Sequence, residues 1–208
     1  HIGGSTPFFA DITHHLMQGE NLIMIEVDNS RRADAVPMHH TDWFNHGGLY
    51  RDVELVKIPK LHITNFLIHL TTDGVRVDLT LSAPQSGVAK IDIAGLYCED
   101  IAVRDGTASV TIKAKPKLWS PHDPKLYDVS VSFDKDIVFD RVGFRHIERR
   151  GTSLYLNGNP LWLRGIGVHE EDKEQGKCSD EVDIRRRFKH LRELGANIAR
   201  LSHYPHHE

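Results

Sequence analysis

Residues 161–204 read LWLRGIGVHEEDKEQGKCSDEVDIRRRFKHLRELGANIARLSHY, and this stretch decides the expected fold. A strand pattern over residues 161–166 is followed, beyond a polar loop, by apolar residues at helical spacing over 182–194. Residues 197–201 then give a second short strand pattern. A strand, a crossover helix and a strand at this spacing predict two parallel strands.

The expected helix has clear start and stop signals. Ser179 or Asp180 can cap its first turn, and Gly195 can end it in the left-handed conformation. Parallel strands must be covered on both faces, which a single strand-helix-strand unit cannot do alone. The sequence therefore predicts the beginning of a larger parallel barrel.

Polar residues follow both expected strands. In barrels of alternating strands and helices, function lies at the carboxyl ends of the strands. Those ends supply Gly167, His169, Glu170, Glu171 and Asp172 after the first strand, and Ser202, His203 and Tyr204 after the second. Taken singly, His203 reads as a capped loop residue and His169 as a hydrated surface residue. Their joint placement at adjacent strand ends favours a binding site.

Arg200 lies inside the second expected strand. A charge on a buried strand is costly unless it reaches a carboxylate. Two interpretations weigh equally and stay open: Arg200 holds an active-site carboxylate, or it makes an ordinary structural ion pair.

The first 58 residues carry two strand patterns and one long loop. Residues 22–27 are almost continuously apolar, which is typical of a buried sandwich strand. Residues 49–56 alternate, which indicates a half-buried strand. The polar loop over residues 28–48 has no periodicity of its own, and loops of that length are usually binding loops.

Short strand patterns separated by turns fill the middle of the chain, from Leu61 to about Phe144. They predict an antiparallel sandwich of immunoglobulin type that acts as a spacer or packing module. A further hairpin is expected over residues 154–163. The expected sandwich strands cover residues 63–70, 75–81, 88–93, 108–112, 127–133 and 137–142.

Composition excludes several classes of protein. The net charge is -3, with 26 basic and 29 acidic residues well mixed, so the chain lacks the footprint of a nucleic-acid or anionic-membrane binder. No apolar run approaches the roughly 18 residues of a membrane helix. Cys98 and Cys178 read as free thiols, which excludes a disulfide framework.

The 15 histidines raise the question of a metal site. None of their consecutive pairs has the i, i+4 helical spacing with an intervening Glu that a zinc hydrolase needs, and no Cys-x-x-Cys accompanies them. We therefore expect no metal site built from these pairs, which are His14-His15, His39-His40 and His206-His207.

Further motifs lie along the chain in a characteristic order. They are DWFNHGGLYRDV at 42–53, LWSP at 118–121 with PKLY at 124–127, GFR at 143–145 with LNGNP at 156–160 and LRGIGVHE at 163–170, and RLSHYP at 200–205. In this order they resemble glycoside hydrolase family 2, the group of β-galactosidases, β-glucuronidases and β-mannosidases. The resemblance spans essentially the whole chain.

The resemblance implies a mainly β fold in three parts. Residues 1–58 would be the C-terminal part of a jelly-roll sugar-binding domain. Residues 59–144 would be an immunoglobulin-like β-sandwich. Residues 145–208 would be the start of a truncated (β/α)8 catalytic barrel.

The resemblance also implies roles for individual residues. His169 and His203 match histidines that contact sugar hydroxyls, and Arg200 matches an arginine that orients the nucleophilic carboxylate. Asp42 aligns with an aspartate that reaches from the jelly roll into the sugar pocket. Gly167-Val168 departs from the Asn-Arg of the better-known β-galactosidases, which leaves the sugar open.

For the parent protein, the resemblance implies a retaining exo-β-glycosidase that works through a covalent glycosyl-enzyme. β-Galactosides are the first expected substrates, with β-glucuronides or β-mannosides as alternatives. Both catalytic carboxylates would lie beyond residue 208, so the chain alone is expected to be inactive. No cofactor is required, although the family allows structural sodium or magnesium, and a carbohydrate is the expected partner. Whether the protein is a homo-oligomer stays open.

A second class of function is a non-catalytic carbohydrate-binding module of two sandwiches. Such a module would hold sugars through Asp42, Trp43 and His46. The strand-helix-strand pattern argues against it, because a binding module has no use for part of a barrel. A third interpretation, a purely structural fragment, is compatible with the glycosidase parent.

Overall fold

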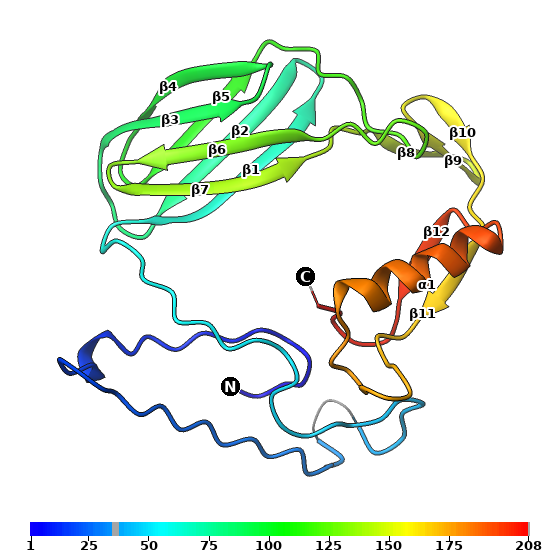
Figure 1. Cartoon of the computed structure of the whole chain (residues 1–208). Helices are drawn as coiled ribbons and strands as arrows, with labels where there is room; N and C mark the ends of the chain where they lie inside the picture. The colour runs from blue at the N-terminus through cyan, green and yellow to red at the C-terminus, as the bar shows by residue number, and fades with distance from the viewer. Residues whose placement is uncertain (35–37, 208) are drawn as a thin grey trace. The chain divides into compact units, whose positions relative to one another are not determined.

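The computed structural model describes residues 1–34 and 38–207 and divides the chain into two compact units (Figure 1). One unit is Leu55–Trp162, and the other joins His1–Glu54 to Leu163–Glu208. The described residues form strands β1 to β12, one α-helix and one short 3-10 helix, so the fold is mainly β, as predicted. Residues 35–37, within the expected loop, and residue 208 lie outside the described part.

Two antiparallel sheets form a sandwich in the Leu55–Trp162 unit. The strand order is β4-β3-β6-β7 in one sheet and β1-β2-β5 in the other (Figure 1). All six expected strands are present, which confirms the predicted immunoglobulin-type sandwich. The strands are β1 (Ile63–Thr71), β2 (Gly74–Leu81), β3 (Gly87–Ile93), β4 (Tyr97–Val103), β5 (Thr107–Ile112), β6 (Tyr127–Phe133) and β7 (Asp136–Val142).

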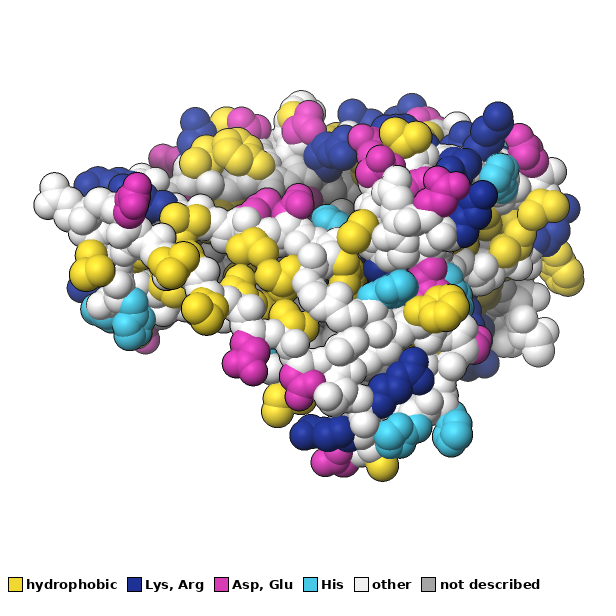
Figure 2. All heavy atoms as spheres, turned by 60° about the horizontal axis from the view of Figure 1, so that its bottom comes forward, with side chains coloured by type: hydrophobic (Ala, Val, Ile, Leu, Met, Phe, Trp, Pro, Cys, Tyr) yellow, Lys and Arg dark blue, Asp and Glu magenta, His cyan; other side chains and the backbone are white. Residues whose placement is uncertain are grey.

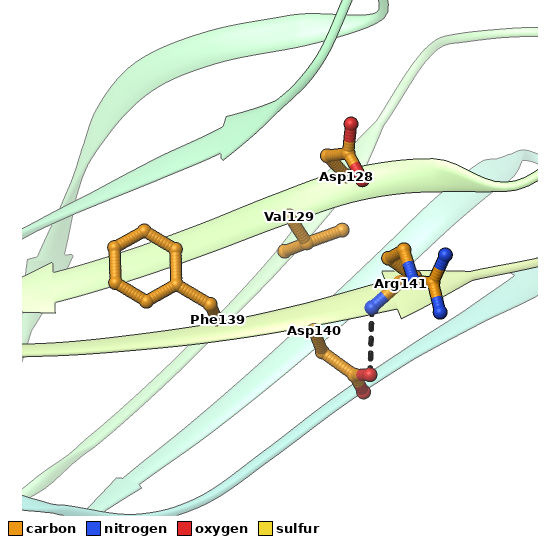
Figure 3. A pocket seen from close by; sticks show the side chains of 5 residues that line it. All are labelled: Asp128, Val129, Phe139, Asp140 and Arg141. Carbon is orange, nitrogen blue, oxygen red and sulfur yellow. Dashed lines mark hydrogen bonds between the residues drawn. The ribbon is translucent and has the colours of Figure 1, made fainter. Parts of the chain in front are cut away.

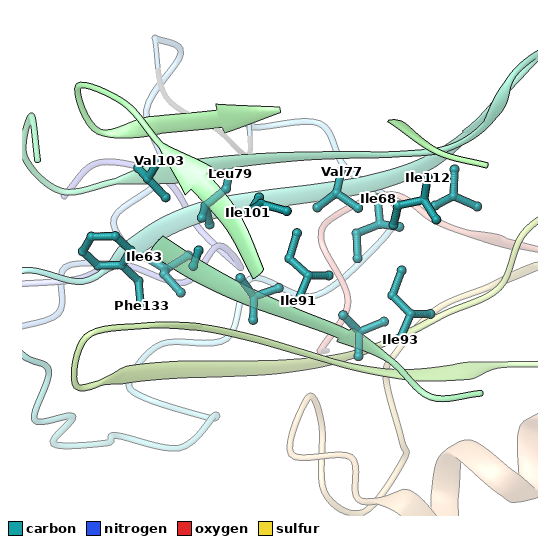
Figure 4. Packing of buried hydrophobic residues seen from close by; sticks show 14 of the residues in the cluster. Ile63, Ile68, Val77, Leu79, Ile91, Ile93, Ile101, Val103, Ile112 and Phe133 are labelled. Carbon is teal, nitrogen blue, oxygen red and sulfur yellow. The ribbon is translucent and has the colours of Figure 1, made fainter. Parts of the chain in front are cut away.

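The inner faces of the two sheets share one apolar core (Figure 4). Strand alternation produces it, because every second side chain of a strand points to the same face. In β2 the residues Val75, Val77, Leu79 and Leu81 are buried and their neighbours are not. Burying a Val or Ile side chain fully stabilises the fold by about 1.5–3 kcal/mol, so this core supplies the main driving force of the unit.

Strand β4 was not predicted from the sequence. Its burial is uneven: Ile101 and Val103 are buried, whereas Cys98, Glu99 and Asp100 form an exposed run. An exposed run of three residues masks the two-residue period on which strand prediction depends.

A small three-stranded sheet follows the sandwich, with the order β10-β9-β8. The predicted hairpin is β9 (Ser153–Leu156) with β10 (Asn159–Leu161), and β8 (Ile147–Arg150) is an additional strand. At its turn Asn157 and Gly158 have φ values of 53° and 80°, as a type I′ turn requires. The Asn157 side-chain amide donates to the Trp119 carbonyl at 2.9 Å, which ties the hairpin to the LWSP motif.

The predicted strand-helix-strand is present in the other unit. β11 (Gly165–Val168) and β12 (Ile198–Leu201) pair in parallel and are joined by α1 (Glu181–Glu193). Asp180 caps the helix by accepting a hydrogen bond from the Asp183 amide at 2.9 Å, and Gly195 follows it with φ at +70°. The first strand begins later than the predicted residue 161, because Leu161 pairs with β9 instead.

The strands predicted at 22–27 and 49–56 are wrong. Within His1–Glu54 the described secondary structure is a single 3-10 helix, Thr13–His15. Leu22 and Met24, expected to be buried, are 91% and 86% exposed. A strand persists only when a neighbour satisfies its backbone groups, and none of the described strands pairs with these residues. Hydrophobic side chains accordingly lie at the surface in Figure 2.

Both cysteines are free, as predicted, and both are exposed. Among the described residues, no helix combines the length and apolar character that crossing a membrane requires.

Candidate functional site

The carboxyl ends of β11 and β12 bring two predicted site residues together. His169 follows β11 and His203 lies just past β12, beyond a cis Ser202–His203 peptide bond. Their ring centroids are 5.1 Å apart with the planes nearly perpendicular. The two side chains are 29% and 30% exposed, so they are held by the protein and remain open to solvent.

Asp42 reaches the same place from the N-terminal segment. Its Oδ2 lies 3.6 Å from Nε2 of His203, which is too long for a hydrogen bond but close enough for electrostatic attraction. One ligand-type atom from each of Asp42, His169 and His203 lies within 4.8 Å of the others. We call these three residues the strand-end cluster.

An aromatic wall flanks the strand-end cluster. The Trp43 ring lies 5.5 Å from the His203 ring and 5.8 Å from the Tyr204 ring, centroid to centroid. Trp43 is adjacent to Asp42 in the chain, so one short stretch brings both a carboxylate and an aromatic ring to the histidines. An apolar ring face beside polar groups suits a ligand that has both kinds of surface.

Arg200 also contacts the cluster, but not as the sequence predicted. Its side chain is exposed, so the expectation of a charge on a buried strand is wrong. The two-stranded pair β11-β12 leaves this face open to solvent. The guanidinium Nη2 lies 3.3 Å from Nδ1 of His203. All four predicted site residues are therefore brought together.

A buried ion pair underlies the site. The Glu170 side chain is 3% exposed, and its Oε2 accepts a hydrogen bond from Nη2 of Arg51 at 2.7 Å. Its Oε1 accepts one from the His207 amide at 2.8 Å. The Glu170 amide in turn donates to the Tyr204 hydroxyl at 3.0 Å. Glu170, the residue after His169, thus ties the end of β11 to Arg51 and to the segment that follows β12.

Arg51 was not recognised in the sequence as part of the site. It also donates to the Ser5 carbonyl at 2.8 Å and to the Pro205 carbonyl at 2.7 Å. These contacts join segments separated by tens to more than a hundred positions in the chain. No periodicity reports such contacts, and the only available signal was the GGLYRDV motif that contains Arg51.

Lys177 and Tyr204 form a buried cation–π contact, with Nζ 3.7 Å from the ring centroid. Burial lowers the pKa of Lys177, and the nearby carboxylates of Glu171 and Glu170 oppose that shift. Burial raises the pKa of Tyr204 to about 12, so its hydroxyl stays protonated at neutral pH. Tyr204 therefore acts here as a neutral hydrogen-bond partner.

Glu171 connects the two chain segments that carry the cluster. Its Oε1 accepts a hydrogen bond from the Phe44 amide at 3.0 Å, and its Oε2 lies 3.8 Å from Nδ1 of His169. One carboxylate therefore holds the backbone near Asp42 and faces a histidine of the cluster. Asp172 instead stabilises its own loop, because a hydrogen bond from the Glu174 amide lowers its pKa and it pairs with Arg186 at 2.8 Å.

The strand-end cluster does not suit sodium or magnesium. These hard cations prefer oxygen ligands, and the cluster offers one carboxylate beside two imidazoles. Imidazole nitrogen suits transition metals instead. None of the consecutive histidine pairs contributes to the cluster.

A separate open hollow lies in the sandwich unit. It has a volume of about 410 Å³ and lies over β6 and β7 (Figure 3). Its lining residues are Asp128, Val129, Phe139, Asp140 and Arg141. The Asp140 carboxylate accepts a hydrogen bond from the Arg141 amide at 2.6 Å. This open surface offers no paired acid and base, so we assign it no function.

Comparison with known proteins gives a consistent result. The model of "Glycosyl hydrolases family 2" matches residues 61–145, and the model of "Glycosyl hydrolases family 2, TIM barrel domain" matches residues 147–208. Together the two matches cover most of the chain.

Individual relatives carry related names. A Formosa agariphila protein provisionally named beta-glucuronidase is 32% identical over 99% of this chain and 27% of its own length. A beta-galactosidase of Thermoanaerobacter pseudethanolicus is 31% identical over 99% of this chain and 31% of its own length. The chain thus spans about a fifth to a third of the length of the curated relatives it matches.

Among solved structures, beta-glucuronidase 3 of Bacteroides uniformis superimposes with a TM-score of 0.72 and 29% identity. The match covers 86% of this chain and 25% of that one.

Proposed function

This chain belongs to glycosyl hydrolase family 2, and from that premise we propose that its parent protein is a retaining exo-β-glycosidase acting on terminal β-galactosides. The observation that carries the proposal is the convergence of Asp42, His169 and His203 at the ends of two parallel strands. Carboxyl ends of barrel strands are where enzymes of this architecture bind substrate.

The cluster has the chemistry to hold a sugar through its hydroxyl groups. The Asp42 carboxylate can accept hydrogen bonds, and the imidazoles of His169 and His203 can donate or accept. The ring of Trp43 offers an apolar surface on which the C–H face of a sugar ring can pack. Hydrogen bonds to ring hydroxyls that strengthen in the oxocarbenium-like transition state lower the barrier to glycosidic cleavage.

The reaction needs two further carboxyl groups about 5 Å apart. One attacks the anomeric carbon while the other protonates the leaving oxygen, and water then releases the sugar from the enzyme. We expect these groups from later strands of the parent barrel, so that residues 1–208 contribute binding and no bond cleavage.

The charge of the cluster favours a neutral sugar. A uronic acid would bring its own carboxylate close to Asp42, and like charges at short distance repel. A galactoside carries a hydroxymethyl group instead, which can donate to that carboxylate. This argument supports β-galactosides over β-glucuronides.

A β-uronide is the second candidate, for two reasons. A matching solved structure from Eisenbergiella tayi is titled a beta-galacturonidase, with a TM-score of 0.72 and 26% identity over 86% of this chain and 35% of that one. The Arg200 guanidinium beside His203 also provides a positive charge that a uronate carboxylate could meet.

We also keep the three-part organisation as a proposal: the end of a jelly roll at 1–58, a sandwich at 59–144 and a barrel start at 145–208. The starts of the two family matches, at residues 61 and 147, support the two internal boundaries.

The deciding experiment assays the parent protein on nitrophenyl β-galactoside, β-glucuronide and β-mannoside, with the 208-residue chain beside it. We expect hydrolysis of the galactoside by the parent and none by the chain. Activity of the purified chain would contradict the assignment of cleavage to later strands. Inactivity of both would support a binding module.

An Asp42→Asn variant of the parent separates the two sugars. We expect kcat/KM for the galactoside to fall roughly 10- to 100-fold, which is the usual loss of a hydrogen bond to a charged group. Asp34→Asn is the matched control, since Asp34 lies in the same segment and pairs with Arg32 at the surface. A gain on the glucuronide in Asp42→Asn would confirm that the Asp42 charge repels a uronate, whereas an unchanged kcat/KM for the galactoside would contradict the role given to Asp42.

A further inference from the structure

The strand-end cluster has the donor set of a transition-metal site. Two imidazoles and one carboxylate are typical ligands of divalent zinc, cobalt or iron. The ligand-type atoms of Asp42, His169 and His203 lie within 4.8 Å of one another, so small movements would let them share an ion. A site built for sugar hydroxyls and a site built for a metal would therefore use the same three residues.

His169 alone is compatible with either use. Its Nδ1 faces the Glu171 carboxylate at 3.8 Å. A carboxylate behind one imidazole nitrogen leaves the other nitrogen free to bind a metal, and this arrangement is common around zinc. Whether the cluster binds a metal or a sugar therefore depends on which ring nitrogen of His203 carries the proton.

The contact between Arg200 and His203 determines the position of that proton. A guanidinium can only donate hydrogen bonds, so Nδ1 of His203, 3.3 Å from Nη2 of Arg200, must present its lone pair. The proton of the neutral ring then resides on Nε2, because the bond made by one nitrogen fixes the state of the other. Nε2 faces the Asp42 carboxylate at 3.6 Å.

A protonated Nε2 cannot coordinate a metal ion. Coordination through Nε2 would force the proton onto Nδ1, where it would point at the N–H groups of Arg200. The positive guanidinium would also repel a divalent cation only a few ångströms away. Arg200 has room to make this contact because its partner across the strands is Gly167, which has no side chain on that face.

We propose that Arg200 determines the ligand class of the strand-end cluster by holding His203 in its Nε2–H form. It keeps the cluster a hydroxyl-binding site and excludes divalent transition metals. Arg200 acts through His203, so it is a positioning residue. The hydroxyl-binding half of the statement rests on the proposed function, whereas the exclusion of metal rests on the geometry alone.

The first test reads the tautomer directly in the 208-residue chain. Long-range proton–nitrogen NMR correlation of the ¹⁵N-labelled chain distinguishes protonated from bare ring nitrogens, and His203→Gln assigns the His203 signals. We expect His203 to be the Nε2–H form in the neutral state. A Nδ1–H form would overturn the proposal, and this measurement needs no Arg200 variant to fold.

The second test uses Co²⁺ alone as the probe, since its visible absorption reports coordination. We expect Arg200→Met to bind Co²⁺ at least about tenfold more tightly than the unaltered chain, because repulsion between a divalent ion and a nearby guanidinium is worth about that factor even in water. The gain should disappear in Arg200→Met/His203→Ala and in Arg200→Met/Asp42→Asn.

Arg192→Met is the matched control, because Arg192 is an exposed arginine of α1. It should bind Co²⁺ with the same affinity as the unaltered chain. That affinity gives the background from histidines outside the cluster. Arg200→Lys should retain most of the exclusion, since it keeps the positive charge. Equal Co²⁺ affinity in Arg200→Met and the unaltered chain would overturn the proposal. Neither test uses sugar hydrolysis, so a wrong substrate assignment would leave both results intact.

Discussion

The two units of the chain are stabilised by different means. The sandwich of Leu55–Trp162 has a continuous core in which Val75, Ile91 and Val131 are fully buried. The unit of His1–Glu54 with Leu163–Glu208 is held by polar contacts, chiefly the buried pair Arg51–Glu170. The first kind of stability is spread over many side chains, whereas the second is concentrated in a few. Single substitutions should therefore destabilise the unit that contains them and leave the other unit unchanged.

The largest effect should come from Glu170→Gln. Removing one partner of a buried ion pair typically costs about 3–5 kcal/mol, because the other charge stays buried without compensation. Hydrogen exchange with mass spectrometry should show faster exchange in peptides of β11, α1 and β12, and unchanged exchange in β1 to β7.

Glu174→Gln is the matched control in the same loop, since its side chain is 74% exposed and pairs with Lys173 at the surface. It should change exchange by an amount equivalent to about 0.5 kcal/mol or less. If Glu170→Gln also accelerated exchange throughout the sandwich, the two units would not be energetically separate.

The converse substitution is Ile91→Ala in β3. Truncating a fully buried isoleucine costs about 2–5 kcal/mol, since it loses apolar burial and leaves a cavity. Exchange should then accelerate across β1 to β7. Ile137→Ala, at a site 51% exposed on β7, should cost much less and serves as the control. Equal costs at the two sites would contradict the assignment of the core.

A smaller effect is expected at the start of α1. Asp180→Ala removes the hydrogen bond to the Asp183 amide and should lower helix stability by about 1 kcal/mol. Exchange of the first-turn amides measures this loss. Asp180→Asn keeps a capping oxygen and should restore most of the protection; if it did not, the cap would act through its charge instead.

The smallest effect is the alkaline titration of Tyr204. The folded pKa of about 12 lies above the value near 10 expected for the unfolded chain, so this contribution to stability is complete below pH 10 and is lost between pH 10 and 12. The phenolate absorbance of the chain minus that of Tyr204→Phe should show a single group titrating near 12. A group titrating near 10 would mean that Tyr204 is solvated.

The same contrast explains what could be predicted from the sequence. The sandwich strands were found because their inward residues alternate, and the helix because Asp180 and Gly195 mark its ends. Strand β4 was missed where three exposed residues interrupt the alternation. The strand at 22–27 was predicted from its apolar run, but a run does not reveal whether a neighbouring strand pairs with it.

Only part of the candidate site could be predicted from the sequence. His169 and His203 could be predicted to meet, because parallel strands end at the same edge. The family resemblance added Asp42. Arg51 could not be found, because its contacts with Ser5 and Glu170 join distant positions and follow no period.

The two cysteines give each unit its own chemical reporter. Cys98 lies on β4 of the sandwich and Cys178 in the loop before α1, and both thiols are exposed. Exposed thiols can be alkylated or labelled without unfolding the protein. A Cys98→Ser or Cys178→Ser variant would leave a single attachment point, so a fluorophore could follow either unit alone. The two thiols therefore allow local unfolding of one unit to be measured while the other unit stays folded.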